Sequence, residues 1–344
     1  MNVLYFLPRP LALAFGGQEV QLLQTAAALR PLGVQVRYAD YFDRDLLRGI
    51  DLVHLFGSDH VYAQLVKLLR ARGLPYVVSS VFYPVGRDRQ AQALLAQVPY
   101  SQSWLRGQVL RHAAAVLPNS RAEQDLLKGM FGLEDRAFTV VPNGVDPMFV
   151  GRDPDAFRAH LPPGWPDGTP FLLSVGRIER RKNSLLLLRA AARLRVPVVF
   201  IGAPVEAERE YTDTFFRELH TYPGHAAHLT GFPPGSDTLA NAYAAAHAHA
   251  LLSDLETPGL ANLEAALNGA NLVVGDALPV REYLESAATL VNPHHLDDVV
   301  TALHTALERP RNALGQRERV AGRYTWARVA GQTAQVYRRV LGEA

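Results

Sequence analysis

The chain has 344 residues, which is more than one hydrophobic core ordinarily serves, so we expect two domains. With 48% hydrophobic and 20% charged residues, its composition is typical of a globular protein. The formal net charge of +2 argues against a nucleic-acid binder, and the absence of Cys excludes a disulfide framework and a thiolate metal site.

The N-terminal segment has the pattern of a strand, a glycine loop, a helix and a second strand. The apolar run 3–7 predicts a buried strand, and a helix is predicted from about residue 18 to residue 30. The loop between them closes on Gly16-Gly17, and a strand is predicted at 34–38. This order is typical of a dinucleotide-type half, in which a glycine pair lets the backbone approach a ligand. A plain turn is the alternative reading of the two glycines.

Alternation of strands and helices continues as far as residue 141. Such alternation predicts an α/β fold with a parallel sheet covered by helices on both faces. The predicted strands are 51–56, 76–80, 114–117 and 138–141, and the predicted helices are 60–72, 88–97, 102–113 and 121–131.

Residues 60–122 are strongly basic and contain a single acid, Asp88. An ordinary solvated surface explains this excess. The alternative is a face for an anionic acceptor or for peripheral contact with a membrane. The cations are Lys67, Arg70, Arg72, Arg87, Arg89, Arg106, Arg111 and Arg121.

Prolines and glycines interrupt the pattern between residues 142 and 170, which predicts an interdomain linker with one short helix near 153–160. We therefore expect an N-terminal domain at 1–150 and a C-terminal domain at 165–324. The final helix, 325–344, is expected to return to the first domain, because its apolar side chains need a surface to cover.

The second half opens with an apolar strand, 171–176, that ends in Gly176. Four cations and one acid, Glu179, then precede a helix predicted from Ser184 to Arg195. Cations at a helix N-terminus oppose the helix dipole, unless an anion such as a phosphate or diphosphate lies between them. The alternative is that these long side chains extend into water. The cations are Arg177, Arg180, Arg181 and Lys182.

Two glutamates, Glu256 and Glu264, flank a Pro-Gly turn after the apolar strand 248–252. Thr257 is the expected N-cap of the following helix and Pro258 its first residue. Glu256 could be a simple cap as well as a ligand. Glu264 falls at the edge of the apolar stripe of that helix, where a carboxylate needs hydrogen-bond donors, from a salt bridge or from sugar hydroxyls.

The other elements predicted in this half continue the alternation. The strands are 196–201, 227–230, 272–274 and 289–291, and the helices are 206–220, 237–246, 279–286 and 295–308.

Several motifs are missing or incomplete. No Gly-x-Gly-x-x-Gly follows a strand, which argues against a nicotinamide enzyme, and there is no Walker A sequence. Four pairs have metal-like spacing but no third ligand, so we expect no metal. They are Asp43 with Asp45, Asp153 with Asp155, His225 with His228, and His247 with His249.

Together, four motifs give the chain a resemblance to the retaining GT-B nucleotide-sugar glycosyltransferases of family 4 over nearly its whole length. They are Gly16-Gly17, Pro142-Asn143-Gly144-Val145-Asp146, the Gly-Arg-x4-Lys element that begins at Gly176, and the pair Glu256 and Glu264. The resemblance implies two Rossmann-like parallel-sheet domains that face each other across a cleft. It departs at Pro258, where relatives carry Phe, and in the absence of His at 77–83.

The resemblance also implies roles for individual residues. Arg177 and Lys182 would bind the donor diphosphate, Glu256 the donor sugar and Glu264 the ribose, so that Arg177, Lys182 and Glu256 are the catalytic candidates. Backbone near Gly259 and Leu260 would meet the sugar and phosphate. The glycines expected at the donor are Gly16, Gly17, Gly176 and Gly259.

The implied activity is transfer of a sugar, of the hexosyltransferase type, from a nucleoside-diphosphate sugar to an acceptor hydroxyl with retention of configuration. No cofactor or metal is expected, and the acceptor could be a glycan, a lipid or a small molecule. The alternatives are a nucleotide-sugar epimerase and an inactive nucleotide-binding scaffold. Without a basic leader or a long apolar run, we expect a cytoplasmic protein, or one peripheral at the inner face of the membrane.

Overall fold

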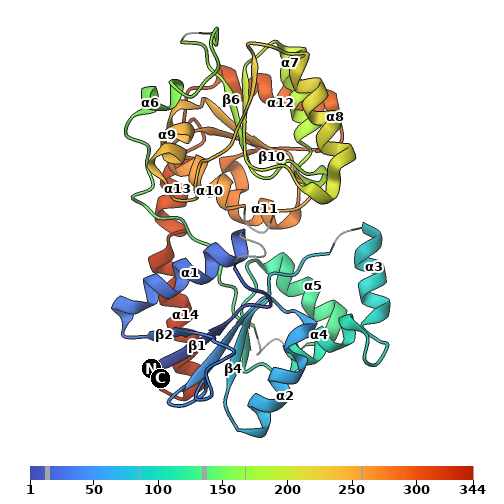
Figure 1. The fold of residues 1–344 in the computed structure, drawn as a ribbon, viewed down its shortest axis with the longest axis vertical. Helices are drawn as coiled ribbons and strands as arrows, with labels where there is room; N and C mark the ends of the chain where they lie inside the picture. Colours follow the sequence, from blue (N-terminus) through green and yellow to red (C-terminus); the bar gives the residue numbers. More distant parts are fainter. Residues whose placement is uncertain (12–15, 85, 134–137, 167, 257–258, 344) are drawn as a thin grey trace. The chain divides into compact units, whose positions relative to one another are not determined.

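A computed structural model of the protein describes all residues except 12–15, 85, 134–137, 167, 257–258 and 344. The chain forms two compact units, each an α/β unit with its own sheet (Figure 1). The first unit comprises Met1–Gly144 and Thr325–Ala344, and the second comprises Val145–Tyr324. The two parallel-sheet α/β units confirm the predicted fold class.

The first unit has a five-stranded sheet of order β2-β1-β3-β4-β5 in which all neighbours are parallel. Its strands are β1 (Asn2–Phe6), β2 (Gln35–Tyr38), β3 (Leu52–Phe56), β4 (Tyr76–Ser79) and β5 (Ala115–Val116). Its helices are α1 (Gly17–Leu29), α2 (Ala63–Ala71), α3 (Gly86–Leu95), α4 (Gln102–Arg111), α5 (Arg121–Phe131) and α14 (Trp326–Leu341).

The strand predicted at 138–141 is wrong. Phe138 forms only an isolated parallel bridge with Val116, at the edge of the sheet beside β5. Strand β5 is only two residues long. Pro118, two residues after its end, has no N–H to donate to a neighbouring strand. Thr139 and Val141 still donate to the Val116 and Pro118 carbonyls at 2.9 Å, but Pro118 donates no bond in return, so the pairing does not continue as a strand.

The last helix, α14, lies against α1 in the first unit (Figure 1). Its Tyr337 is fully buried, and its hydroxyl lies 2.9 Å from that of Tyr5 and 2.6 Å from Nδ1 of His54. Nε2 of His54 lies 2.9 Å from Oγ of Ser79. A buried chain of polar contacts thus joins α14 to β1, β3 and β4, and burial lowers the pKa of His54 to about 3.

The second unit has a six-stranded parallel sheet of order β11-β10-β9-β6-β7-β8. Its strands are β6 (Leu172–Val175), β7 (Val198–Ile201), β8 (Ala226–Leu229), β9 (Ala248–Leu251), β10 (Asn271–Gly275) and β11 (Thr289–Val291). Its helices are α6 (Pro154–Arg158), α7 (Ser184–Leu194), α8 (Arg209–His220), α9 (Asp237–Ala245), α10 (Leu260–Leu267), α11 (Leu278–Leu284), α12 (Leu296–Glu308) and α13 (Gln316–Arg323).

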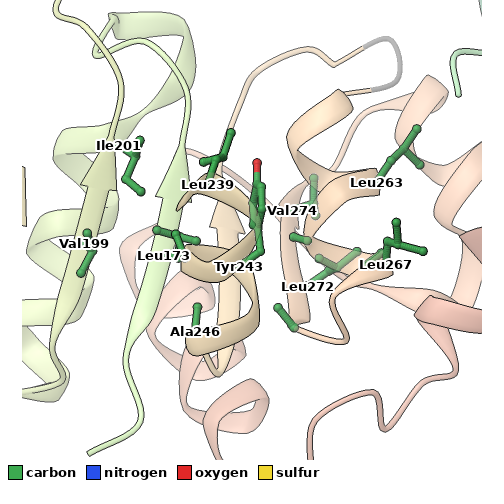
Figure 2. Close-up of a cluster of buried hydrophobic side chains, with 14 of the residues drawn as sticks. Leu173, Val199, Ile201, Leu239, Tyr243, Ala246, Leu263, Leu267, Leu272 and Val274 are labelled. Atoms are coloured by element: carbon green, nitrogen blue, oxygen red, sulfur yellow. The ribbon is translucent and has the colours of Figure 1, made fainter. Parts of the chain in front are cut away.

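Two apolar cores cover the two faces of this sheet, because successive side chains of a strand point to opposite faces. Leu173 and Val199 belong to the core under α9, α10 and α11, whereas Leu172 and Val198 belong to the core under α7, α8 and α12. Figure 2 shows the first of these cores, with the Tyr243 hydroxyl pointing out of the apolar cluster.

Two further differences from the sequence-based expectations have physical causes. Helix α13 was not predicted because its sequence is strongly polar, and only Gln316 and Val320 are buried. The segment predicted as a linker, 142–170, contributes Val145, Phe157 and Trp165 to a core of the second unit. Within the described residues, no helix has the length and apolar character of a membrane span.

Candidate donor site

The second unit has a topological switch point between β6 and β9. From β6 the chain builds the sheet in one direction through β7 and β8, and from β9 it builds in the other through β10 and β11. Ligands of open parallel sheets bind outside the carboxyl ends of the strands at such a point. The loop after β6 contains Arg177 and Lys182, and the loop after β9 contains Glu256, so both predicted motifs lie at this edge.

A close backbone approach fixes the start of the first loop. Gly176 donates its N–H to the Ile201 carbonyl at 2.9 Å. A Cβ on Gly202, whose φ is +147°, would stand 2.1 Å from the Gly176 carbonyl oxygen. Only glycine at 202 therefore allows the ends of β6 and β7 to approach so closely. Arg177 follows directly after this contact.

Hydrogen bonds join the two loops across the switch point. Asn183 donates from Nδ2 to the Leu252 carbonyl at 2.9 Å and to Oδ1 of Asp254 at 2.6 Å. Arg181 donates from Nη1 to the Leu255 carbonyl at 2.8 Å, and the Asp254 N–H donates to the Arg181 carbonyl at 3.0 Å. The loops therefore form one connected layer at the end of the sheet.

Within this layer, Nζ of Lys182 forms an ion pair and hydrogen bond with Oε1 of Glu256. The Lys182 side chain is only 13% exposed, so the alternative that the cations of this loop extend into water is wrong for Lys182. Burial alone would raise the pKa of Glu256, but the charge and hydrogen bond of Lys182, assisted by Arg181, hold it below its usual value. The glutamate is thus ionised and serves as an internal anion for the lysine.

Glu179 connects the other cations of the loop. Its two oxygens lie 3.2 Å from Nη2 of Arg177 and 2.9 Å from Nη2 of Arg181. Arg181 is in turn 4.0 Å from Glu256. The Arg177 side chain is 60% exposed despite its ion pair, whereas Lys182 is only 13% exposed in its pair with Glu256.

Glu264 lies one turn into α10 and accepts a hydrogen bond from the Tyr243 hydroxyl at 2.8 Å. Burial raises the pKa of Glu264 to about 7, although the Tyr243 hydrogen bond opposes this shift. The sequence indicated that Glu264 needs a donor but not which one. Tyr243 could have been suspected, because its hydroxyl sits on a helix whose other buried residues are apolar.

Helix α10 begins at Leu260, with Gly259 at the N-cap. The Gly259 N–H donates to the Tyr283 hydroxyl at 3.1 Å, and a Cβ on Gly259 would stand 2.9 Å from Oε2 of Glu256. Glycine thus lets the Glu256 carboxylate lie against the backbone of the turn. The expected N-cap Thr257 and first residue Pro258 lie outside the described residues.

The predicted site residues fall into two groups. Those of the second unit lie on the two connected loops and on the first turns of α10. Gly16 and Gly17 belong to the first unit, where Gly17 begins α1 and the Gly16 N–H donates to Glu19 at 2.9 Å. Sequence reasoning gave no bonding role to Glu179, Asn183, Tyr243 or Tyr283.

The residues with metal-like spacing have other partners. Nε2 of His247 lies 2.8 Å from the Arg309 carbonyl, and Nε2 of His228 lies 2.7 Å from the Gly202 carbonyl. His249 is fully buried beneath the loops, where burial and the charge of Lys182 lower its pKa to about 3. In the described part of the chain, no group of three or more His, Cys, Asp or Glu side chains could hold a metal ion.

Comparison with protein families matches both units. A family described as glycosyl transferases group 1 matches residues 157–321, and a glycosyl transferase 4-like domain matches residues 17–144.

Curated relatives include two proteins named D-inositol 3-phosphate glycosyltransferase. The protein from Mycolicibacterium smegmatis is 30% identical over 69% of this chain and 55% of its own length. The protein from Kineococcus radiotolerans is 31% identical over 68% of this chain and 59% of its own length. The chain therefore spans little more than half the length of these relatives.

Solved structures share the fold. Sucrose-phosphate synthase from Thermosynechococcus elongatus matches with a TM-score of 0.80 at 20% identity, over 100% of this chain and 99% of its own. Anabaena HepE in complex with UDP matches with a TM-score of 0.78 at 17% identity, over 97% of this chain and 99% of its own. The fold and motifs define a GT-B protein. The chain belongs to the glycosyltransferases of group 1.

Proposed function

We propose that this chain transfers a sugar from a nucleoside-diphosphate sugar to an acceptor hydroxyl with retention of anomeric configuration, as a hexosyltransferase. The proposal rests on one observation above the others. Lys182 and Glu256 come from two different loops and meet at the switch point of the second unit. Such an edge is where an anionic nucleotide binds in open parallel sheets.

In this proposal the donor diphosphate binds Arg177 and Lys182, and the amide of Leu260 at the start of α10 adds a third donor. As the bond to the sugar breaks, negative charge grows on the diphosphate, and these groups stabilise that charge. Leu260 is the first residue of α10, and the first N–H groups of a helix have no partner within the helix.

The two glutamates have separate parts in the proposal. Glu264 accepts hydrogen bonds from the ribose hydroxyls, beside the one from Tyr243. Once the diphosphate has replaced Glu256 beside Lys182, the Glu256 carboxylate accepts hydrogen bonds from hydroxyls of the donor sugar. No divalent metal enters the proposal, because two cations and a helix N-terminus together can neutralise the diphosphate.

Uridine nucleotides are the first probes to test, because Anabaena HepE, similar in fold, has been crystallised with UDP and with UDP-glucose. The protein is incubated with a panel of UDP-, GDP- and ADP-sugars and the products are separated. Slow hydrolysis of one donor supports the transferase. A new isomer of the nucleotide sugar would instead indicate an epimerase, and tight binding without any product would indicate a scaffold.

A further inference from the structure

The first unit also places a cation at a sheet edge. Arg106, on α4, reaches the edge where the carboxyl ends of that unit's strands lie. Its Nε donates to the carbonyl of Ser58, two residues after the end of β3, at 3.0 Å. Its guanidinium carbon stands 4.4 Å from the ring centre of Phe82, three residues after the end of β4. Arg106 therefore lies where two neighbouring strands end, at the edge at which parallel sheets bind ligands.

Arg106 has no counter-ion among the residues that the structure describes. Burial lowers its pKa, and Asp59 and Asp88 oppose this shift only from beyond ion-pair distance. Oδ1 of Asp59 accepts a hydrogen bond from the Val61 N–H at 3.0 Å and lies 3.0 Å from Nδ1 of His60. A partly buried cation without a paired anion is costly, unless a ligand supplies the charge.

The guanidinium also has donors to spare. Besides the bond from Nε to Ser58, its one other hydrogen bond within the described residues is a long one, from Nη1 to Oε1 of Gln92 at 3.4 Å. Of five N–H groups, three are therefore left for a further partner. The guanidinium lies over the Phe82 ring, a contact that favours the cation, and a guanidinium can hold an oxyanion by two parallel hydrogen bonds.

The loop that places Phe82 is strained. Val81 has a φ of +42°, a backbone conformation that a β-branched residue rarely adopts. The fully buried carboxylate of Glu123 holds the loop by accepting from Oγ of Ser80 at 2.6 Å and from the Phe82 N–H at 2.7 Å. Strain of this kind persists where the surroundings impose it and is concentrated at ligand sites.

We propose that Arg106 is the anion-binding residue of an acceptor subsite in the first unit, and that the acceptor carries an oxyanion, either a phosphate monoester or a carboxylate. This inference rests on the proposed function, because it names the class of acceptor that the transferase uses. Glu123 is a positioning residue of the subsite, acting through the loop that carries Phe82.

The test is a set of calorimetric titrations of the whole chain, first with UDP and then, in saturating UDP, with small anions. UDP occupies the cations of the second unit, so that the second titration reports on another site. The titrants are inorganic phosphate, glucose 6-phosphate, glucuronate and glucose. Comparison of glucose 6-phosphate with glucuronate identifies which oxyanion is preferred. Glucose shows how tightly an uncharged sugar binds.

Three variants accompany the wild type. Arg106→Gln removes the charge, and Arg106→Lys keeps the charge but loses the planar fork. Arg111→Gln is the matched control, because Arg111 lies on the same helix and also donates to a backbone carbonyl, that of Phe131, at 2.8 Å. Thermal unfolding of each variant shows that it is folded before it is titrated.

We expect the wild type and Arg111→Gln to bind glucose 6-phosphate or glucuronate more tightly than glucose. Arg106→Gln should weaken that binding about tenfold or more, the effect of losing a charge-assisted pair, and Arg106→Lys should fall between. Equal anion affinity in Arg106→Gln and wild type, or no preference of the wild type for an anion, would overturn the inference. If Arg106→Gln does not fold, the inference would be overturned by Arg106→Lys binding the anion as tightly as the wild type does. Failure of the first titration, with UDP, bears on the proposed donor site alone.

Discussion

Lys182 and Glu256 lie 74 positions apart in the sequence, yet they form a direct ion pair at the end of the second unit's sheet. In the proposed donor complex, a phosphate would take the place beside the ammonium that the Glu256 carboxylate occupies in this structure. In the proposed complex, a donor would exchange one anion for another at the largely covered Lys182, whereas the side chain of Arg177, though paired with Glu179 at 3.2 Å, is 60% exposed.

This difference predicts distinct effects of two truncations. Arg177→Ala and Lys182→Ala should each weaken binding of a nucleoside diphosphate by about 1.5–3 kcal/mol, the scale of a hydrogen bond between charged groups. Only Lys182→Ala should also lower the melting temperature, because it leaves the Glu256 carboxylate buried without its cation. Calorimetry and thermal unfolding measure the two effects, with Lys67→Ala on α2 as an exposed control. Unchanged affinity in both variants would refute the diphosphate site.

The two glutamates should differ in the same assay. Glu264→Gln should weaken nucleoside diphosphate binding, because the ribose belongs to that ligand. Glu256→Gln should preserve or tighten it, since the substitution releases Lys182, while it slows turnover of the intact donor. Calorimetry with the diphosphate and a hydrolysis assay with the sugar donor measure these effects. Equal losses of diphosphate affinity in both variants would contradict the assignment.

The raised pKa of Glu264, about 7, predicts a pH dependence of nucleotide affinity. Below that pH the carboxyl group is protonated and accepts hydrogen bonds poorly, and above it the carboxylate accepts them well. Affinity should therefore rise between pH 6 and pH 8. Because the ligand titrates in the same range, Glu264→Gln is the control, and its affinity should rise less. Parallel curves for the two proteins would exclude Glu264 as the titrating group.

The same shift has a consequence for stability with the opposite sign. A carboxyl group whose pKa is higher in the folded than in the unfolded state stabilises the fold at low pH, and this contribution is lost as pH rises through the folded value. Glu264→Gln should therefore cost less stability at pH 8 than at pH 5. Chemical unfolding at the two pH values gives the comparison.

Turnover of the donor should survive excess chelator, since Arg177, Lys182 and the start of α10 can together replace a cation beside the diphosphate. The measurement is the rate of donor hydrolysis with EDTA and after addition of manganese. A rate abolished by EDTA and restored by manganese would contradict this expectation.

Tyr337→Phe should destabilise the first unit without changing nucleotide binding by the second. The substitution leaves the Tyr5 hydroxyl and Nδ1 of His54 buried without their common partner, at a cost of about 1–3 kcal/mol. Chemical unfolding and a UDP titration separate the two effects. A loss of UDP affinity in a fully folded variant would show that the network has a further role.

The location of the donor motifs could be predicted from sequence for a simple reason. Loops that follow parallel strands share one edge of the sheet, so Gly176-Arg177 and Glu256 had to lie at the same edge once their strands were recognised. The pairing of Lys182 with Glu256 could not be predicted, because it requires β6 and β9 to be neighbours. In the sequence, the neighbours of β6 are β5 and β7.

The sequence also could not show which groups the tyrosines on helices bind, even where a tyrosine such as Tyr243 could be suspected of a polar role. Tyr243 and Tyr283 lie in apolar helix faces, and what their hydroxyls bind depends on how α9 and α11 pack against α10. Local pattern also failed at polar α13, whose burial comes from only two residues. At Phe138 the pattern indicated a strand, but the pairing with β5 is limited to one bridge with Val116, because Pro118 has no N–H to continue it.

The return of α14 to the first unit determines the order in which the protein can fold during synthesis. The second unit, Val145–Tyr324, is complete before the ribosome has made Thr325. The first unit lacks Tyr337 and the rest of α14 until those residues have been made, after the whole second unit, and until then Tyr5 and His54 lack their common partner. The second unit, which begins later in the sequence, can therefore complete its fold before the first unit does. The nascent segment before Val145 is the part that chaperones have most time to bind.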